Sequence, residues 1–457
     1  MSEAITNTPP KPMPSAIRPR RGGPLIAWLV ILGVVGVILW RNSRPAEESK
    51  AEWLVPMQME GRYLVGAANS GIQIPRADLY KQAKETLDKG SDAKRLRFAV
   101  LAGELSGPEE ARRVLAGLKP SEEATLLSRL YAGGKLSDAE KVTLETSLGW
   151  FGELAVGSQD DEARARAMNP ARRTFFGLVG VILAGFGALL LGGFFLVLLG
   201  ILVHMGKLRG GVVPGGGNGG IYAETFALYM ALFIGASFLL RFLTRYLPED
   251  WGGLWLSGVV MILSLAALAW PVIRGVRWAD VRRDLGLYTG GIADIPLGIG
   301  TYLIALPLLG LGLLVMFGMM LLRRHMGLGD PESAGPSHPI IGIALSGDIW
   351  AWVQMIFVAC VLAPLVEEIM FRGALYQHLR EIGPGLAKWA SVAFSVLLSG
   401  FVFAAIHPQG WLGVPVLMSL ATAFALSREW RGSLVPAMIA HGINNGMSTL
   451  MLLTFAT

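Results

Sequence analysis

Three short motifs near the C-terminal end of the sequence place ionisable and amide side chains within apolar segments. The motifs are Glu367-Glu368-Ile369-Met370-Phe371-Arg372, Phe403-Ala404-Ala405-Ile406-His407 and His441-Gly442-Ile443-Asn444-Asn445. Such groups are costly inside a membrane unless they are paired or used, so they mark a functional site by default. Carboxylates and imidazoles transfer protons, and imidazole or amide N–H groups stabilise oxyanions. The residue types therefore predict general-base activation of a water beside an oxyanion site.

Helical geometry separates the two carboxylates of the first motif. Residues four apart share a face, so Glu368 can pair with Arg372, whereas Glu367 points about 100° away. Glu368 is therefore the better candidate for a structural ion pair, and Glu367 for the general base. Pro364 removes one backbone hydrogen bond a turn earlier and so frees the carbonyl of Cys360.

The other two motifs supply partners for Glu367. His441 and Asn445 are four residues apart, so both side chains project from one helix face and can donate two hydrogen bonds to a developing oxyanion. His407 ends its helix just before Pro408, where it can orient a water against Glu367. Phe403 opens the same motif and is expected to support the site.

The depths of these residues allow one shared site. A helix rises about 1.5 Å per residue, so from the predicted cytoplasmic loops Glu367 lies roughly 20 Å along its helix and His407 roughly 30 Å. His441 lies roughly 14 Å and Asn445 roughly 20 Å along theirs. These values scatter around the middle of a hydrocarbon core about 30 Å thick, and helix tilts absorb the spread.

The composition predicts the helices that must position these groups. The 457 residues are 53% hydrophobic and only 16% charged, which is too apolar for an ordinary soluble enzyme. We expect an all-α fold: a polytopic membrane helical bundle with an inserted soluble helical domain. About nine segments are expected to span the bilayer, namely residues 23–40, 175–203, 221–243, 254–273, 295–322, 349–379, 386–406, 411–426 and 433–455.

The order of segments predicts six regions. They are a disordered basic tail (1–22), a transmembrane anchor (23–40), a soluble helical domain (41–172), accessory transmembrane helices (173–322), a linker (323–345) and the transmembrane core that carries the motifs (346–457). In the soluble domain, Ser106, Ser121 and Ser137 are expected to begin helices, Ser137 with Glu140 as a capping box. This domain lacks His and Cys, and we expect it to be a scaffold or to bind a protein partner rather than to catalyse a reaction.

The net charge of +6 comes mostly from Lys and Arg residues at the ends of apolar segments. This pattern follows the positive-inside rule, so the partner it indicates is the lipid bilayer and not a nucleic acid. It predicts a cytoplasmic N-terminus and an extracytoplasmic position for residues 41–172. Arg323 and Arg324 are the exception, because this topology places them on the extracytoplasmic side.

The three motifs resemble those of the CPBP family of intramembrane proteases. This family comprises the type II CAAX prenyl endopeptidases and the bacterial Abi proteins linked to bacteriocin processing and self-immunity. Its pattern is Glu-Glu-x-x-x-Arg, Phe-x-x-x-His and His-x-x-x-Asn on successive helices, and all three occur here in order, within residues 345–455. The resemblance implies peptide-bond hydrolysis in the membrane, with Glu367 and His407 activating the water and His441 and Asn445 stabilising the oxyanion.

Two further expectations follow from the resemblance. Members of the family are often described as metalloproteases, and Glu367, His407 and His441 have the side-chain types of zinc ligands. However, the motifs lack the HExxH spacing and a Glu-activated water needs no metal, so the favoured mechanism uses no cofactor. The expected substrate is a membrane-associated peptide or protein, and the expected location is the bacterial inner membrane.

Two alternatives belong to other classes of protein. One is a non-catalytic membrane scaffold or a peptide-toxin immunity protein that uses the same helices to bind a partner. The other is a transporter, because intramembrane Glu and His residues can form a proton relay. Against a transporter, the polar groups cluster in the last four helices and no inverted repeat is visible.

Overall fold

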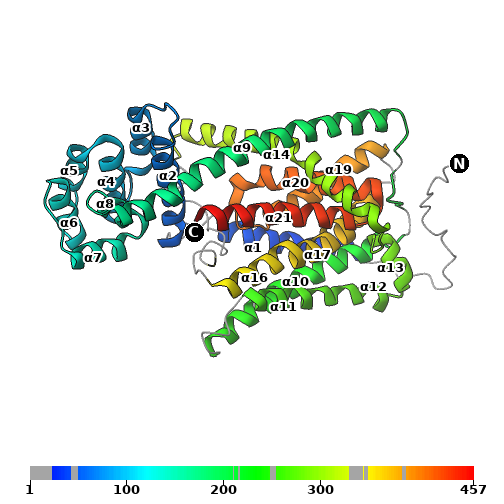
Figure 1. Cartoon of the computed structure of the whole chain (residues 1–457). Helices are drawn as coiled ribbons and strands as arrows, with labels where there is room; N and C mark the ends of the chain where they lie inside the picture. Colours follow the sequence, from blue (N-terminus) through cyan, green and yellow to red (C-terminus); the bar gives the residue numbers. More distant parts are fainter. Residues whose placement is uncertain are drawn as a thin grey trace. The chain divides into compact units, whose positions relative to one another are not determined.

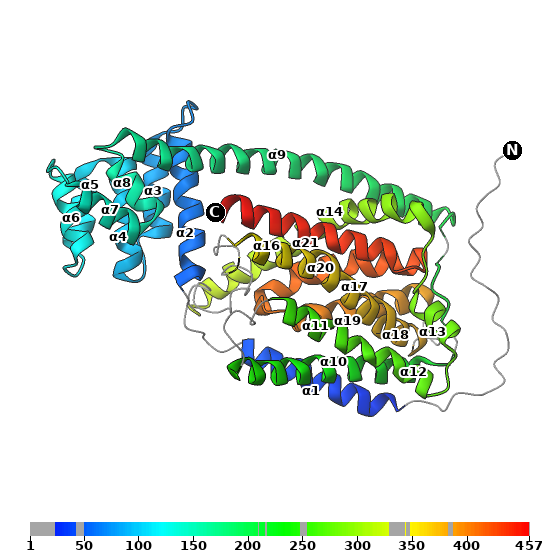
Figure 2. The ribbon, with the colours of Figure 1, turned by 60° about the horizontal axis from the view of Figure 1, so that its bottom comes forward.

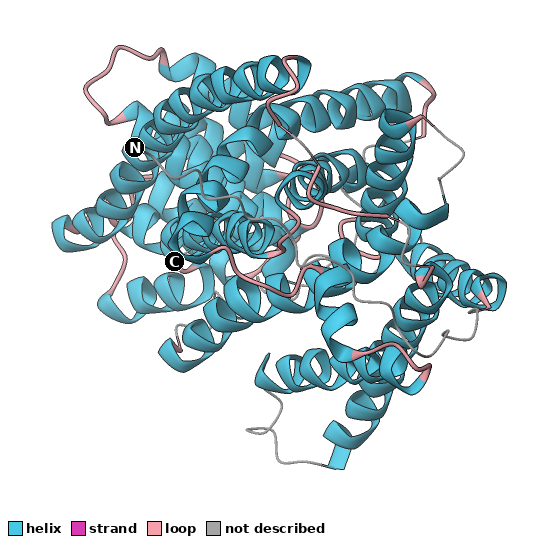
Figure 3. Ribbon diagram, turned by 90° about the vertical axis from the view of Figure 1, so that its right-hand side faces the viewer, coloured by secondary structure: helices cyan, strands magenta, loops and turns pink. Residues whose placement is uncertain are grey.

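The computed structural model describes residues 23–42, 50–208, 210–214, 217–246, 254–328, 343, 348–382 and 387–456. Within these ranges the chain is helical and contains no strand (Figure 3). The predicted all-α class is therefore confirmed. The predicted tail, residues 1–22, and most of the predicted linker, residues 323–345, lie outside the described part of the chain.

Eight helical segments in the described part are long and apolar enough to cross a membrane, and they correspond to the first eight predicted spans. They are α1 (Pro24–Asn42), α9 (Asp161–His204), α10 with the short turn after it (Gly219–Tyr246), the α11–α12 segment (Leu254–Ile273), α14 with the turn before it (Gly291–His325), the helix Ile349–Ile382, α19 (Lys388–Ala405) and α20 (Gly410–Arg431). The ninth, α21 (Val435–Ala456), has 22 residues but also carries polar groups, and it is not among the eight. The chain is an integral membrane protein.

The chain divides into two compact units, which are described separately. The membrane unit comprises residues 1–47 and 187–450, and the helical unit comprises residues 48–186 and 451–457. The predicted boundaries of the six regions remain predictions. Within the membrane unit, α20 packs against both α14 and α19, and α1 packs against α10, as Figures 1 and 2 both show.

The helical unit is built on short helices around α4. These are α2 (Lys50–Ala68), α3 (Arg76–Leu87), α4 (Asp92–Ser106), α5 (Pro108–Ala116), α6 (Glu122–Tyr131), α7 (Asp138–Leu148), α8 (Trp150–Val156) and the beginning of α9. Helix α4 contacts α3, α5 and α8, and it places Phe98 and Leu101 in the core, where both are fully buried. Phe151 of α8 is buried in the same core.

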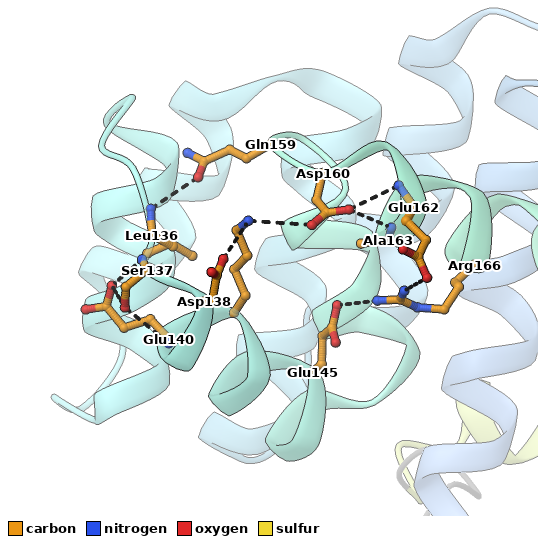
Figure 4. A network of polar contacts seen from close by, with 11 residues as sticks. Leu136, Ser137, Asp138, Glu140, Glu145, Gln159, Asp160, Glu162, Ala163 and Arg166 are labelled. Atoms are coloured by element: carbon orange, nitrogen blue, oxygen red, sulfur yellow. Dashed lines mark hydrogen bonds and ion pairs between the residues drawn. The ribbon is translucent and has the colours of Figure 1, made fainter.

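Helix caps in this unit follow two of the three serine predictions. Ser137 and Glu140 form the predicted capping box at the start of α7 (Figure 4), and Ser121 accepts a hydrogen bond from the Ala124 N–H. The prediction for Ser106 is wrong. Ser106 is the last residue of α4, and Gly107, with a φ of 100° that favours glycine, separates α4 from α5.

Candidate active site

The helix that carries the two glutamates is not a regular α-helix. It runs through α16 (Ile349–Phe357), a π-helical turn (Val358–Leu362), α17 (Ala363–Glu367), a second π-helical turn (Glu368–Leu375) and α18 (Tyr376–Ile382). In a π-turn each N–H bonds the carbonyl five residues back, as the Ala363 N–H does with the Val358 oxygen. The next N–H in this series would come from Pro364, which has none. The carbonyl without its helical donor is therefore that of Ala359, and the prediction of Cys360 was wrong by one residue because it assumed an α-helical register.

Helix α21 supplies the missing donor. The Asn445 Nδ2 donates to the Ala359 oxygen at 2.8 Å. This contact requires a close approach of the two helices, which Gly442 permits: a Cβ at this position would lie 2.6 Å from the Cys360 oxygen. Glycine at 442 and proline at 364 thus act together to dock α21 on the π-turn.

Glu368 and Arg372 form a fully buried ion pair. The Arg372 Nη1 donates to the Glu368 Oε1 at 2.9 Å, and the two side chains are 0% and 1% exposed. The guanidinium also lies over the rings of Phe403 and Phe424, 4.4 and 5.5 Å from their centroids. These contacts compensate a charge that would otherwise be costly to bury.

His441 bridges the two glutamates. Its Nδ1 lies 2.9 Å from the Glu368 Oε1, and its Nε2 lies 3.7 Å from the Glu367 Oε2. The ring stacks on Phe424 with a centroid distance of 5.3 Å and an interplanar angle of 23°. Since an ionised carboxylate only accepts hydrogen bonds, the Nδ1 of His441 carries a proton.

His407 approaches Glu367 from the turn after α19, because that helix ends at Ala405 and not, as predicted, at His407. Its Nδ1 donates to the Phe403 carbonyl oxygen at 2.6 Å, because a carbonyl can only accept. In the neutral ring the Nε2 is then an acceptor, and this atom lies 4.0 Å from the Glu367 Oε2. The ring packs on Phe403, with the centroids 4.3 Å apart.

The predicted site residues gather in one place, with one difference in accessibility. The side chains of Glu367 and His407 are 17% and 20% exposed, whereas those of Glu368 and Arg372 are closed off from the surface of the protein. Glu367 is therefore the carboxylate that a reactant can reach. Asn445 follows His441 by four residues on α21 and is held at the Ala359 carbonyl.

Sequence reasoning missed two parts of this site. Phe424 on α20 contacts both His441 and Arg372, but one aromatic residue in an apolar helix gives no signal of such a role. The Ala359 carbonyl was also missed. Pro364 indicates this carbonyl, because proline has no N–H and Ala359 is the residue five positions before it in a π-helical hydrogen-bond pattern.

The three zinc-ligand candidates do not fit a metal site as they are arranged. The Nε2 atoms of His407 and His441 both approach the same oxygen of Glu367, at 4.0 and 3.7 Å. Among the residues that the structure describes, no group of three or more His, Cys, Asp or Glu side chains is placed to hold a metal ion. No step below is therefore assigned to a metal.

Comparison with known families agrees with the motifs. Residues 349–447 match the family model described as type II CAAX prenyl endopeptidase Rce1-like, and this confirms the predicted family for the segment that carries the site. No curated protein and no solved structure matches the chain.

Proposed function

We propose that this protein is an intramembrane endopeptidase that hydrolyses a peptide bond of a membrane-associated protein or peptide. The match of residues 349–447 to the type II CAAX prenyl endopeptidase Rce1-like family supports this proposal. One observation carries the proposal: two imidazole Nε2 atoms lie 3.7 and 4.0 Å from a single oxygen of the accessible Glu367. A carboxylate flanked in this way can take a proton from water while the histidines act on the same reacting centre.

Glu367 and His407 are assigned to the activation of water. A separation of 4.0 Å between the Glu367 Oε2 and the His407 Nε2 allows one water to lie about 2.8 Å from both atoms. Both atoms accept, so the water donates its two protons to them and turns an oxygen lone pair towards the substrate. The hydrogen bond from the His407 Nδ1 to the Phe403 carbonyl supports this tautomer.

His441 is assigned to the oxyanion. Its Nδ1 proton is committed to Glu368, so its Nε2 can donate only when the ring is an imidazolium. In that form the charges of Arg372, Glu368, His441 and Glu367 sum to zero. Each buried charge then has an opposite partner, which is the arrangement that a low-dielectric site requires.

Asn445 is assigned as the second oxyanion donor. A side-chain amide has two N–H protons, and the Ala359 carbonyl takes one of them. This bond fixes the plane of the amide, and the second proton is left for the substrate oxygen. The docking of α21 on the π-turn thus supports a preorganised donor.

The bond changes balance without a co-reactant other than water. The water oxygen bonds to the scissile carbonyl carbon, a proton passes to Glu367, and the carbonyl electron pair moves onto the oxygen held by His441 and Asn445. When the tetrahedral intermediate collapses, the C–N bond breaks and the proton on Glu367 passes to the leaving amine. The products are a carboxylic acid, whose hydroxyl keeps the second water proton, and an amine.

The orientation in the membrane is part of the proposal. The arrangement of Lys and Arg residues supports a cytoplasmic N-terminus and an extracytoplasmic position of residues 41–172 in a bacterial inner membrane. Protease added outside intact spheroplasts is expected to cleave within residues 41–172. Full protection of this region would overturn the orientation.

The test of the activity uses the purified full-length protein in liposomes of phosphatidylethanolamine and phosphatidylglycerol. The probes are a fluorescence-quenched peptide with an S-farnesyl cysteine followed by two aliphatic residues and a C-terminal residue, the same peptide without the prenyl group, and a single-span membrane peptide. Glu367→Gln is expected to lower cleavage about 10²–10⁴-fold and Asn445→Ala about 10²–10³-fold. The control is His325→Ala, since His325 is exposed at the end of α14. Cleavage that is unchanged in Glu367→Gln would overturn the assigned site, and unchanged function of this variant in cells would favour a scaffold.

A further inference from the structure

The N-terminal anchor helix reaches the active site. The Asn42 Nδ2, at the end of α1, donates to the backbone oxygen of His407 at 3.1 Å. Asn42 lies 365 positions before His407 and outside the segment that matches the family model. The contact therefore joins an accessory helix to a residue of the proposed reaction.

The His407 carbonyl lies in the short turn between α19 and α20. Helix α19 ends at Ala405, two residues before His407. Pro408 follows directly and has no N–H, and α20 begins at Gly410, whose φ is 66°. Asn42 supplies this short turn with a donor from another element.

The other end of α1 is fixed to the glutamate helix. The Trp28 Nε1 donates to the His378 Nε2 at 2.9 Å, and His378 lies on α18, beyond Glu368 and Arg372. Between these ends, α1 buries Ile31 and Val35. Trp28 and Asn42 are 14 residues apart, which corresponds to about 21 Å of rigid helix. Helix α1 thus spans from the end of the glutamate helix to the end of α19.

We propose that Asn42 is a positioning residue for His407. By holding the His407 carbonyl, it fixes the turn after α19 and so the direction in which the imidazole Nε2 faces Glu367. The role in catalysis rests on the proposed function, whereas the effect on the histidine itself does not. A misplaced catalytic group lowers the rate of the chemical step while leaving ground-state binding unchanged.

The experiment measures the reactivity of His407 directly. The full-length protein in detergent is treated with diethyl pyrocarbonate, and carbethoxylation of each histidine is followed by mass spectrometry, with the exposed His204 and His325 as references. Asn42→Ala and Asn42→Asp both remove the N–H donor, and the aspartate keeps the shape of the side chain. The matched control is Arg41→Ala, because Arg41 precedes Asn42 on α1 and is exposed.

Loss of one neutral hydrogen bond is expected to raise the carbethoxylation rate of His407 about fivefold in both Asn42 variants, with no change in the control. For whichever quenched peptide is cleaved, kcat is expected to fall about fivefold while KM stays within about twofold. An unchanged rate at His407 would overturn the proposal, and so would an Asn42→Asp variant that matches the wild type. Equal increases at His407 and the buried His378 would also overturn it, because they indicate general loosening.

The two proposals can fail separately. If Glu367→Gln cleaves normally but the Asn42 variants still change the reactivity of His407, the protease assignment fails and the positioning contact remains. If Glu367→Gln is inactive and His407 reacts at the wild-type rate in the Asn42 variants, only the positioning role fails.

Discussion

Replacing Arg372 by methionine removes the cation of the buried pair and keeps most of the side-chain stem. The change leaves the Glu368 carboxylate 0% exposed, with the His441 Nδ1 as its remaining partner. Breaking a buried ion pair from one side costs about 3–5 kcal/mol, because an uncompensated charge remains in the interior. The contacts of the guanidinium with Phe403 and Phe424 are lost as well, at about 1 kcal/mol.

The geometry of the pair favours the lower part of this range. One hydrogen bond joins the two groups, and within the described residues the Arg372 Nη2 and the Glu368 Oε2 have no hydrogen-bond partner. A pair joined by two parallel bonds would lose more. Together with the lost aromatic contacts, we therefore expect Arg372→Met to lower the free energy of unfolding by about 4 kcal/mol.

The double variant Glu368→Gln with Arg372→Met tests the cause of this loss. Neither buried charge remains, so we expect it to be about 2 kcal/mol more stable than Arg372→Met alone. Unfolding is measured by titration with dodecyl sulfate in bicelles, followed by circular dichroism, and Arg324→Met at the exposed end of α14 is the control. The reasoning is refuted if Arg372→Met lies within about 0.5 kcal/mol of the wild type, or if the double variant is no more stable than the single one.

Three further predictions concern the docking of α21, the helical unit and the metal. Gly442→Ala is expected to lower the free energy of unfolding by about 1–3 kcal/mol, since the new Cβ would lie 2.6 Å from the Cys360 oxygen. Gly446→Ala is the control and should be near neutral, because its Cβ would lie 3.8 Å from the Cys360 Sγ. Equal effects of the two changes in the dodecyl sulfate titration would contradict the docking. Arg129 and the capping bonds lower the pKa of Glu140 from 4.5 to about 2, so the stability from this carboxylate is present above pH 4.5 and lost as the pH falls towards 2. Hydrogen exchange in α7 should show this loss, and Glu140→Gln should flatten it; the same pH profile in both proteins would disprove the assignment. Cleavage of the peptide should continue in the presence of the zinc chelator phenanthroline. A loss of cleavage that stoichiometric zinc restores would refute the metal-free mechanism.

The fold was accessible from the sequence because a bilayer imposes strong local rules. A spanning helix needs about 20 apolar residues, and each of the eight apolar segments found in the structure meets a predicted one. Helix α21 is the exception, since its site residues interrupt the apolar pattern that identifies a span. The error at Ser106 has a local cause: Gly107 and Pro108 both punctuate helices, and the serine rule does not tell on which side of them the new helix begins.

The site was accessible only in part. The spacing of four residues predicted that Glu368 faces Arg372, and the structure has this pair at 2.9 Å. The two π-turns were not predicted, because π-turns are rare and the motifs were read with the spacing of a regular α-helix. The bridge from His441 to both glutamates likewise joins residues more than 70 positions apart, and spacing along one helix carries no information about it.

The two histidines illustrate what only the structure adds. Both are imidazoles that approach the same oxygen of Glu367, and the sequence gives no reason to distinguish their protonation. Their Nδ1 partners differ, however: a backbone carbonyl for His407 and a buried carboxylate for His441. His407 donates its Nδ1 proton to a carbonyl, and the Nε2 of its neutral ring is then an acceptor, whereas His441 donates its Nδ1 proton to a carboxylate and can also donate from Nε2 only as an imidazolium. The opposite roles proposed for the two residues thus follow from the hydrogen-bond partners of their Nδ1 atoms. Exchanging those partners would be expected to exchange the roles.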